Sequence, residues 1–306
     1  MLVHFGQDNL HAQWTNATVV VGTFDGVHLG HRALVSRAAE LAKTHEEPCV
    51  IVTFDRHPRA LLDPENCPPA LGTLEQNVIA LRQAGASVCL IQPFTKEFAQ
   101  RSAESFLEDL LKRGLMASRI VVGHDFAFGR GREGTPEWLE SRIETHVLEP
   151  VMIGEVRISS TEIRRRIMDG EVGRVPELLG RPFALAGVVV PGQKLGRTLG
   201  FPTINLARSS QTVVPADGVY AGRAHTPTGS FGAAISVGMR PTVAGTDRTI
   251  EAFLLEYPGD SLYGAPVQLE FHEWIRPELA FQSLTELTDH MALDVQRCRE
   301  ILSNSV

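Results

Sequence analysis

Cysteine is scarce in this sequence of 306 residues, which has only four, and these form no CxxC pair and no Cys/His ligand cluster. This scarcity excludes a disulfide framework and gives no zinc-ligand spacing. No run of about 18 consecutive apolar residues occurs, so we expect no membrane-spanning helix. The first residues also lack the basic start and apolar run of a secretory signal. We therefore expect a cytoplasmic protein with reduced thiols and no membrane partner.

Positive charge is also in deficit. The 29 lysines and arginines are outnumbered by 36 aspartates and glutamates, which gives a formal net charge of −7. Binding to nucleic acid needs a clustered basic surface that neutralises phosphates, so we expect no nucleic-acid partner. Any phosphate that the protein binds is expected on a small molecule.

The first part of the chain, from residue 17 to about 180, alternates short apolar runs with segments of helical period. The apolar runs are ATVVVGT, PCVIVTF, SVCLIQPF and RIVVGHDF. Helical patterns follow the first run and recur near residues 74–84 and 103–113. Strands that alternate with helices are typical of βαβ units, so the sequence predicts an α/β domain with a parallel sheet.

The pattern changes near Gly180, where glycine and proline become frequent and apolar runs follow one another without helical spacers. Six such runs predict an antiparallel six-stranded β-barrel. A closing helix is expected from a capping box at Ser283 and Glu286. Its apolar stripe is interpreted as a packing face and consists of Leu284, Leu287, Met291, Val295, Cys298 and Ile301. We expect two domains, residues 1–180 and 181–306.

The stretch GTFDGVHLGH, residues 22–31, follows the first predicted strand and opens the first predicted helix. A turn of this kind presents free backbone N–H groups and the positive end of the helix dipole, which together favour an anion. The turn has neither GxGxxG nor P-loop spacing, which disfavours an NAD-type oxidoreductase. Instead His28 and His31 lie three residues apart, where two imidazoles could stabilise charge that develops on a phosphoryl group.

These residues give the chain a resemblance to a known family. GTFDGVHLGH resembles the nucleotidyltransferase superfamily, which has a Rossmann-like parallel sheet and attacks the α-phosphate of a nucleoside triphosphate. GHDFAFGRGREG, from Gly123, and RISSTEIRRRI, from Arg157, look like the adenylyltransferase half of bacterial bifunctional riboflavin kinase/FAD synthetases. The resemblance covers nearly the whole chain.

The resemblance implies two groups of site residues in the first domain. The first group, which would bind ATP, consists of Gly22, Phe24, Asp25, His28, His31, Ser160, Thr161 and Arg164. The second group, which would bind the flavin, consists of His57, Asp125, Phe126, Phe128 and Arg132. His28 and His31 are expected to be catalytic. Arg165 and Arg166 are interpreted as a solvated helix face.

The second domain resembles riboflavin kinase through GRTLGFPTIN, which starts at Gly196. On a strand, Thr203 and Asn205 face the same way, and their oxygens suit Mg²⁺. The resemblance implies an ATP site made of Gly196, Arg197, Gly200, Pro202, Thr203 and Asn205, with Thr203 and Asn205 also holding the metal.

A carboxylate in the otherwise apolar strand TIEAFLLE is the expected catalytic base. The resemblance implies that Glu251 takes the proton of the ribityl 5′-hydroxyl, whereas Glu256, five residues on, points to the opposite face. Ala252 and Phe253 follow Glu251 where the family commonly has Val-His.

The resulting prediction is a cytoplasmic enzyme that converts riboflavin and ATP into FMN in the barrel, and FMN and a second ATP into FAD in the α/β domain. Mg²⁺ serves both steps, and the partners are small-molecule substrates. One alternative keeps adenylyl transfer but has an inactive barrel, against which Thr203, Asn205 and Glu251 count. Another is a flavin-binding sensor without activity, which would not need the histidine pair or the base.

Overall fold

The computed structural model describes residues 1–7, 14–192, 195–208, 211–242, 245–259 and 261–303, without the side chains of residues 195 and 240–247. By its internal contacts the chain divides into two compact units, Met1–Ser160 and Thr161–Val306. Each unit is described by itself. Among the described residues, no helix is long and apolar enough to cross a membrane.

The first unit contains a six-stranded sheet in the order β1-β4-β3-β2-β5-β6, in which every neighbouring pair is parallel. The predicted parallel sheet is therefore confirmed. Its strands are β1 (Leu2–Phe5), β2 (Ala17–Val21), β3 (Cys49–Phe54), β4 (Val88–Gln92), β5 (Ala117–Gly123) and β6 (Glu144–Leu148). The four predicted strands form the middle of this sheet, and the two unpredicted strands, β1 and β6, form its edges.

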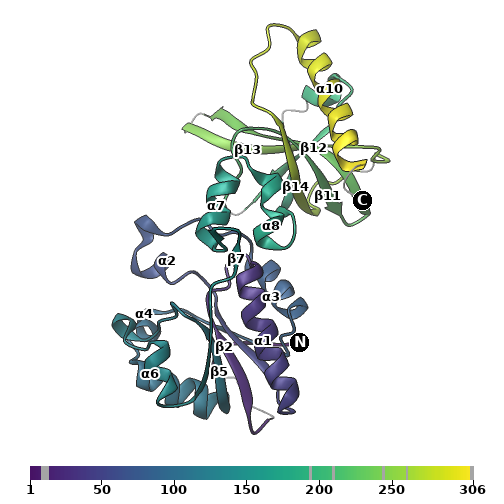
Figure 1. The fold of residues 1–306 in the computed structure, drawn as a ribbon. Coiled ribbons are helices and arrows are strands. Elements are labelled where there is room, and N and C mark those ends of the chain that lie inside the picture. Colours follow the sequence, from purple (N-terminus) through teal and green to yellow (C-terminus); the bar gives the residue numbers. More distant parts are fainter. Residues whose placement is uncertain (8–13, 193–194, 209–210, 243–244, 260, 304–306) are drawn as a thin grey trace. The chain divides into compact units, whose positions relative to one another are not determined.

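Helices cover both faces of the sheet, as Figure 1 shows for α1 and α3 on one side and α4 and α6 on the other. One apolar cluster joins α1 (Leu29–Thr44) and α3 (Leu74–Gln83) to alternate strand residues such as Val20 and Ile51. The other cluster uses the intervening residues, such as Val19 and Val50. This second face is covered by α4 (Lys96–Ala99), α5 (Ala103–Ser105), the π-helical η3 (Phe106–Gly114) and α6 (Pro136–Glu140).

Shorter elements lie in the connections of the first unit. They are α2 (Arg59–Leu62), the 3-10 turns η2 (Pro64–Asn66) and η4 (Arg130–Arg132), and a two-stranded sheet of β7 (Met152–Ile153) and β8 (Val156–Arg157). The turn η4 belongs to a segment, Gly129, Gly131 and Gly134, that has GxGxxG spacing. Phe128 and Gly134 at the ends of this segment form an isolated β-bridge, and the segment is followed by no long helix. The segment is therefore not a dinucleotide-binding fingerprint.

The second unit contains a closed barrel of six strands in the order β10-β13-β12-β11-β14-β9, and all neighbouring strands are antiparallel. The predicted barrel is confirmed, and each of the six apolar runs supplies one strand. The strands are β9 (Phe183–Val190), β10 (Thr203–Ala207), β11 (Gly218–Thr226), β12 (Gly229–Thr242), β13 (Gly245–Leu254) and β14 (Pro266–Arg276).

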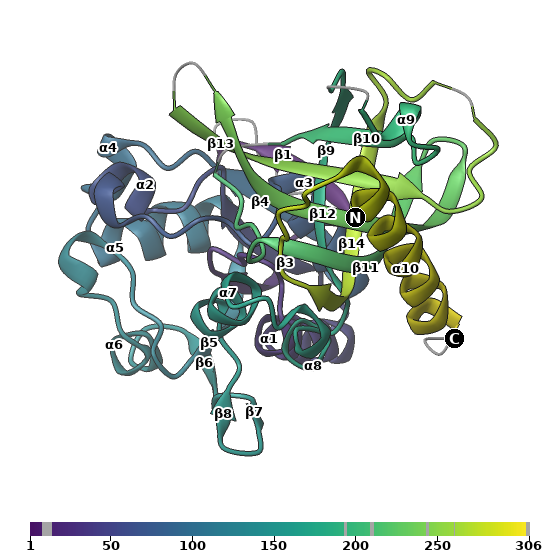
Figure 2. The same cartoon turned by 90° about the horizontal axis from the view of Figure 1, so that it is seen from above.

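The closing helix α10 (Leu284–Ser303) packs beside β11 and β12, as the turned view shows (Figure 2). Ser283 accepts the Glu286 N–H at 3.1 Å, as predicted, but the Glu286 carboxylate receives the N–H of Gln282 rather than that of Ser283. The predicted packing stripe needs a correction. Leu284 is 59% exposed, and the middle of the stripe lines a cavity instead of a solid core.

Three short elements follow the sheet and precede the barrel along the chain: α7 (Ser160–Met168), η5 (Val172–Arg174) and α8 (Pro176–Leu179). A four-residue helix, α9 (Leu195–Thr198), precedes β10. Arg165 on α7 is exposed, as expected. Arg166 is not part of a solvated face. It is buried, and its guanidinium pairs with Glu162 and Glu177 and donates to the Arg174 carbonyl.

Candidate active sites

The first candidate site is the histidine turn, residues 22–31, which connects the end of β2 to α1. Its backbone is strained, because Phe24 and Val27 have φ values of 47° and 43°, a region that side chains with a Cβ rarely adopt. Gly26, between them, has a φ of 78°, which glycine adopts without this penalty. Strain of this kind persists where the surroundings enforce it, and it is found most often at functional sites.

Two segments outside the turn hold it in this conformation. The Asp25 carboxylate accepts the Leu71 N–H at 2.8 Å, and the Asn77 side chain accepts the Gly26 N–H at 3.1 Å. Ser160, the first residue of α7, donates its hydroxyl to the Asp25 carbonyl at 3.0 Å. The carboxylate of Asp25 therefore helps to fix the turn. Sequence reasoning missed Leu71 and Asn77, which carry no motif of their own.

The two imidazoles of the turn are stacked, with ring centroids 3.7 Å apart. His28 is the N-cap of α1 and accepts the His31 N–H through Nδ1 at 3.2 Å. Burial, followed by the neighbouring His28, lowers the pKa of His31 well below its ordinary value. His31 is therefore neutral at pH 7, and its buried Nδ1 has no hydrogen-bond partner among the described residues.

The remaining predicted nucleotide residues are distributed over both units. Gly22 follows β2 as the first residue of the turn. The Phe24 ring is buried against it and stands edge-on to His31, with centroids 5.3 Å apart. Thr161 and Arg164 follow Ser160 on α7 and belong to the second unit, where Thr161 is exposed and Arg164 is buried.

The predicted flavin residues of the first unit follow strands β3 and β5. His57 accepts the Arg59 N–H through Nδ1 at 3.1 Å, which places it at the start of α2. Asp125 pairs with Arg157. Burial alone would raise the pKa of Asp125, but the hydrogen bond and charge of Arg157 outweigh burial and lower it. Arg132 is exposed, with a φ of 62°.

The two phenylalanines of this segment differ in their burial. The Phe126 and Phe128 rings stack with centroids 5.4 Å apart. Phe128 is buried in the core against Phe106 and Trp138, whereas Phe126 is half-buried at the edge of the same cluster. The free face of this aromatic pair therefore belongs to Phe126.

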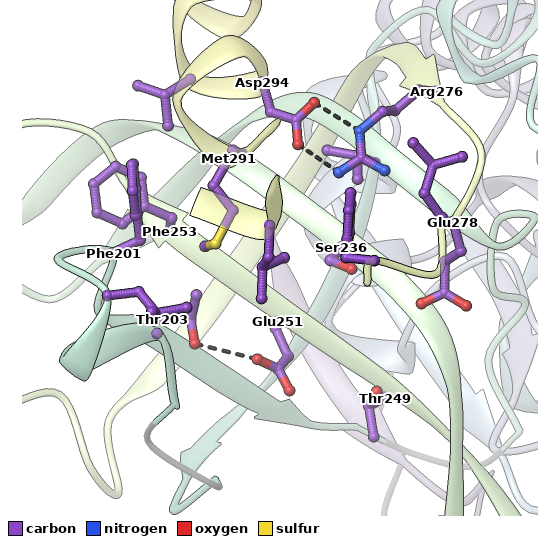
Figure 3. Close-up of a pocket in the computed structure, with 18 of the residues that line it drawn as sticks. Phe201, Thr203, Ser236, Thr249, Glu251, Phe253, Arg276, Glu278, Met291 and Asp294 are labelled. Carbon is purple, nitrogen blue, oxygen red and sulfur yellow. Dashed lines mark hydrogen bonds and ion pairs between the residues drawn. The ribbon is translucent and has the colours of Figure 1, made fainter. Parts of the chain in front are cut away.

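The second candidate site is a pocket of about 620 Å³ in the second unit. Its floor is the outer face of the barrel. Thr249, Glu251 and Phe253 are alternate residues of β13, so they project to one side, and Ser236 lies opposite Glu251 on β12. A wall is supplied by α10 and by the segment before it, residues 277–283 (Figure 3).

Glu251 and Thr203 meet on this floor. Thr203 Oγ1 donates to Glu251 Oε2 at 3.2 Å, and the bond is visible in Figure 3. Asn205 pairs in register with Glu251 across β10 and β13, so its side chain shares their face of the sheet. Glu256, by contrast, lies beyond the end of β13, and its side chain is 82% exposed. The structure therefore brings together the three residues that the sequence singled out.

The predicted loop before β10 lies beside this group. Gly196 lines the pocket, and its carbonyl accepts the Phe201 N–H at 2.8 Å. Arg197, Gly200 and Pro202 are exposed. Gly192 adjoins Asn205 so closely that a Cβ at residue 192 would lie 2.2 Å from Asn205 Nδ2. The chain thus leaves room for the Asn205 amide only because residue 192 is glycine.

Sequence reasoning missed most of the pocket lining. Thr249 and Phe253 could have been found, because they lie two residues on either side of Glu251 on a strand. The side chains of residues 240–242 lie outside the described part of the structure. Glu278 gave no signal at all. Its carboxylate rests against Gly238, and burial, followed by the charge of Asp217, raises its pKa.

Two separate sites, one built for an anion at a helix start and one with a carboxylate beside oxygen ligands, define a two-domain transferase that acts on phosphorylated small molecules. Comparisons with known proteins identify the family. Residues 10–162 match the family model described as FAD synthetase, and residues 179–302 match that described as riboflavin kinase. The chain belongs to the family of bifunctional riboflavin kinase/FMN adenylyltransferases, and it is an enzyme with both activities.

Individual relatives agree with this assignment. The bifunctional riboflavin kinase/FMN adenylyltransferase of Escherichia coli K12 is 36% identical over 92% of this chain and 91% of its own. The Bacillus subtilis enzyme of the same name is 31% identical over 94% and 93%. A crystal structure described as a macrolide-efflux protein from Streptococcus pneumoniae has a TM-score of 0.90 and 30% identity, covering 98% of this chain and 99% of its own.

Proposed function

We propose that the pocket of the second unit binds riboflavin and that Glu251 is the general base of the kinase reaction. The observation that supports this most strongly is the position of Glu251, which stands on the pocket floor and accepts the Thr203 hydroxyl. A general base must lie within hydrogen-bond reach of the proton it removes. Glu251 takes the proton of the ribityl 5′-hydroxyl as that oxygen attacks the γ-phosphorus of ATP and ADP leaves.

The distribution of polar and apolar groups supports an orientation for the flavin. Phe201 and Phe253 stand edge-to-face, 5.4 Å apart, and Met291 lies near them in Figure 3. This apolar end suits the isoalloxazine ring. Thr249 and Glu251 lie at the other end and offer hydrogen bonds to the ribityl hydroxyls.

ATP and Mg²⁺ are proposed to bind beside Glu251. The side-chain oxygens of Thr203 and Asn205 share one face of the sheet with a carboxylate, and oxygen donors of this kind fit a hard cation. When bound, Mg²⁺ would neutralise charge on the transferred phosphoryl group. The chain itself positions the nucleotide through Gly196, Arg197, Gly200 and Pro202, the loop that precedes these ligands.

For the adenylyltransferase reaction we propose the histidine turn as the seat of the ATP phosphates. A phosphate oxygen of FMN attacks the α-phosphorus, and pyrophosphate leaves. His28 and His31 stabilise the charge that develops on the α-phosphoryl oxygens, and the N–H groups at the start of α1 add the positive end of its dipole. Ser160, whose hydroxyl binds the Asp25 carbonyl, adds to this phosphate site. Thr161 and Arg164 keep the nucleotide-binding roles that the family resemblance implies.

The flavin of this reaction is proposed to lie against the segment after β5. Phe126 offers a half-buried aromatic face for the isoalloxazine, supported from behind by Phe128. Asp125, Arg132 and His57 supply the polar contacts around it. The same proposal assigns the adenylyltransferase domain to residues 1–180 and the kinase domain to residues 181–306. It also assigns the protein to the cytoplasm.

Substitution of Glu251 tests the kinase assignment. Glu251→Gln keeps the shape but removes the basic oxygen, so the kcat for FMN formation should fall about 10²–10⁴-fold with little change in riboflavin binding. FMN adenylylation should continue, because the histidine turn is unchanged. Glu256→Gln is the matched control and should alter neither activity. A Glu251→Gln enzyme that keeps kinase turnover within about threefold of the parent would refute the base assignment.

A further inference from the structure

The wall of the riboflavin pocket is formed by α10, and its two halves are held differently. The second half packs into the barrel through Cys298 and Ile301, in one apolar cluster with Ala221 and Leu255. The first half presents Leu287 and Met291 to the pocket. Because a pocket rather than a solid core lies beneath these two side chains, apolar packing alone does not fix the first half of the helix.

An ion pair joins the middle of the helix to the barrel, next to Val295, where the apolar cluster of the second half begins. Arg276, the last residue of β14, donates from Nε to Asp294 Oδ1 at 2.9 Å and from Nη2 to Asp294 Oδ2 at 2.7 Å. The side chains are only 17% and 9% exposed, so the pair is shielded from solvent. Figure 3 shows both bonds at the rim of the pocket. A bidentate contact of this kind fixes orientation as well as distance.

The same guanidinium also fixes the segment between β14 and α10. Arg276 Nη1 donates to the Pro277 carbonyl at 3.0 Å, and the guanidinium lies 5.7 Å from the Phe281 ring centroid. Phe281 in turn contacts His290 on the helix, with centroids 5.1 Å apart. Arg276 therefore contacts the barrel end, the connecting segment and, through Asp294, the helix.

We propose that Arg276 and Asp294 are a positioning pair for the riboflavin kinase reaction, which sets the affinity for the flavin by fixing the α10 wall. The inference rests on the proposed function of the pocket. Met291 and Leu287 lie three and seven residues before Asp294, on the same helix face, so a rotation or shift at Asp294 moves both against the flavin. The proposal assigns to neither member of the pair a contact with the reacting hydroxyl or the phosphate.

The charges in the pocket explain why Arg276 and Asp294 need each other as partners. Arg276 is the one basic side chain among the described pocket-lining residues, which also include Glu251 and Glu278. Asp294 accepts hydrogen bonds from its Nε and Nη2. An apolar pair of similar volume could preserve stability, because buried ion pairs often contribute little net stability, but it would lose the fixed fork geometry.

Steady-state kinetics with riboflavin as the varied substrate test the proposal. In Arg276→Lys, which keeps the charge but not the fork, and in the double variant Arg276→Met/Asp294→Leu, the KM for riboflavin should rise about tenfold. The kcat of the kinase should stay within about threefold, and adenylylation of supplied FMN should not change. Arg297→Met, which breaks an exposed pair with Glu300 on the same helix, is the control and should keep the parent KM.

The double variant separates positioning from simple charge neutralisation. If the double variant had the parent KM for riboflavin, or if the double variant failed to fold, the pair would serve only stability. Either result would overturn the proposal. A loss of kcat with unchanged KM would overturn it as well. Met291→Trp, which fills the pocket, distinguishes the two levels of inference. An unchanged riboflavin KM in Met291→Trp would refute the pocket assignment, whereas a raised KM there with parent-like pair variants would refute the positioning role alone.

Discussion

His28 and His31 have the same side chain but are used differently by the fold. His28 caps α1, because its Nδ1 accepts the hydrogen bond of the His31 N–H. The Nδ1 of His31 has no hydrogen-bond partner within the described residues. A sequence shows the spacing of the two histidines but not this difference in their hydrogen bonding. The two imidazoles are therefore expected to make different contributions to the proposed phosphate site.

The lowered pKa of His31 predicts a pH dependence of stability. The ordinary value is 6.5, so as the pH falls from 7 towards 5 the unfolded chain binds a proton at His31 that the folded protein does not bind. Stability is thus greatest above the ordinary pKa and declines as the pH falls, by up to about 1.4 kcal/mol per pH unit from this group.

Urea unfolding in a Trp274→Phe background, in which only Trp14 and Trp138 of the first unit fluoresce, measures this slope. His31→Asn should reduce the loss of stability between pH 7 and pH 5, and His45→Asn, at an exposed position, should leave it unchanged. If His31→Asn and the parent lose stability equally over this range, His31 is not the neutral buried group described here.

At the scale of elements, α3 and the loop before it act as a brace for the histidine turn. The helix has a complete capping box, in which Thr73 accepts the Gln76 N–H and Gln76 accepts the Thr73 N–H. Its start is thereby fixed, which places Asn77 against Gly26 and Leu71 against Asp25. The histidine turn is thus held by residues that are about fifty positions away in the sequence.

Removal of this brace should impair one activity only. Asn77→Ala leaves the buried Gly26 N–H without its acceptor, a loss of about 1 kcal/mol, so FAD formation from supplied FMN should fall about three- to tenfold. Kinase activity should be unaffected. Asn66→Ala, which removes an exposed side-chain bond to Asp63, is the control. An equal effect of both substitutions on FAD formation would show that the contact with the turn is irrelevant.

Elements with a strong local pattern could be predicted from the sequence, and those without one could not. The central strands β2, β3, β4 and β5 are buried on both faces and so form continuous apolar runs. The edge strands β1 and β6 contain no fully buried residue, so they need no continuous apolar run.

The candidate sites follow the same rule. The histidine turn is a local motif and could be predicted. Thr203 and Asn205 belong to one local motif and Glu251 to another, so these residues could be predicted as well. The α10 wall was interpreted as packing, because an i, i+4 apolar stripe is the same whether it faces a core or a pocket. The Arg276–Asp294 pair joins positions on two elements, and the burial of Arg166 depends on Glu177 from another helix. Such partners are set by the tertiary fold.

At the scale of the whole molecule, the two activities reside in two units with their own cores. We expect a fragment of residues 181–306 to fold and to convert riboflavin to FMN without making FAD. A fragment of residues 161–306 adds α7, η5 and α8, and Gly173 of η5 lies against the His272 carbonyl of β14. It should be at least as stable in thermal unfolding. A shorter fragment that is unfolded beside a folded longer one would move the domain boundary towards residue 160.

The most direct test of two independent sites is a mixing assay with riboflavin, ATP and Mg²⁺, in which FMN and FAD are separated by chromatography over time. His31→Ala alone should accumulate FMN, with FAD formation about 10²–10³-fold slower, and Glu251→Gln alone should form very little of either product. A mixture of the two variants should make FAD from riboflavin, because one supplies the kinase and the other the adenylyltransferase. If the mixture made no FAD although both variants were folded, or if His31→Ala also lost FMN formation, the assignment of the two reactions to separate sites would be wrong.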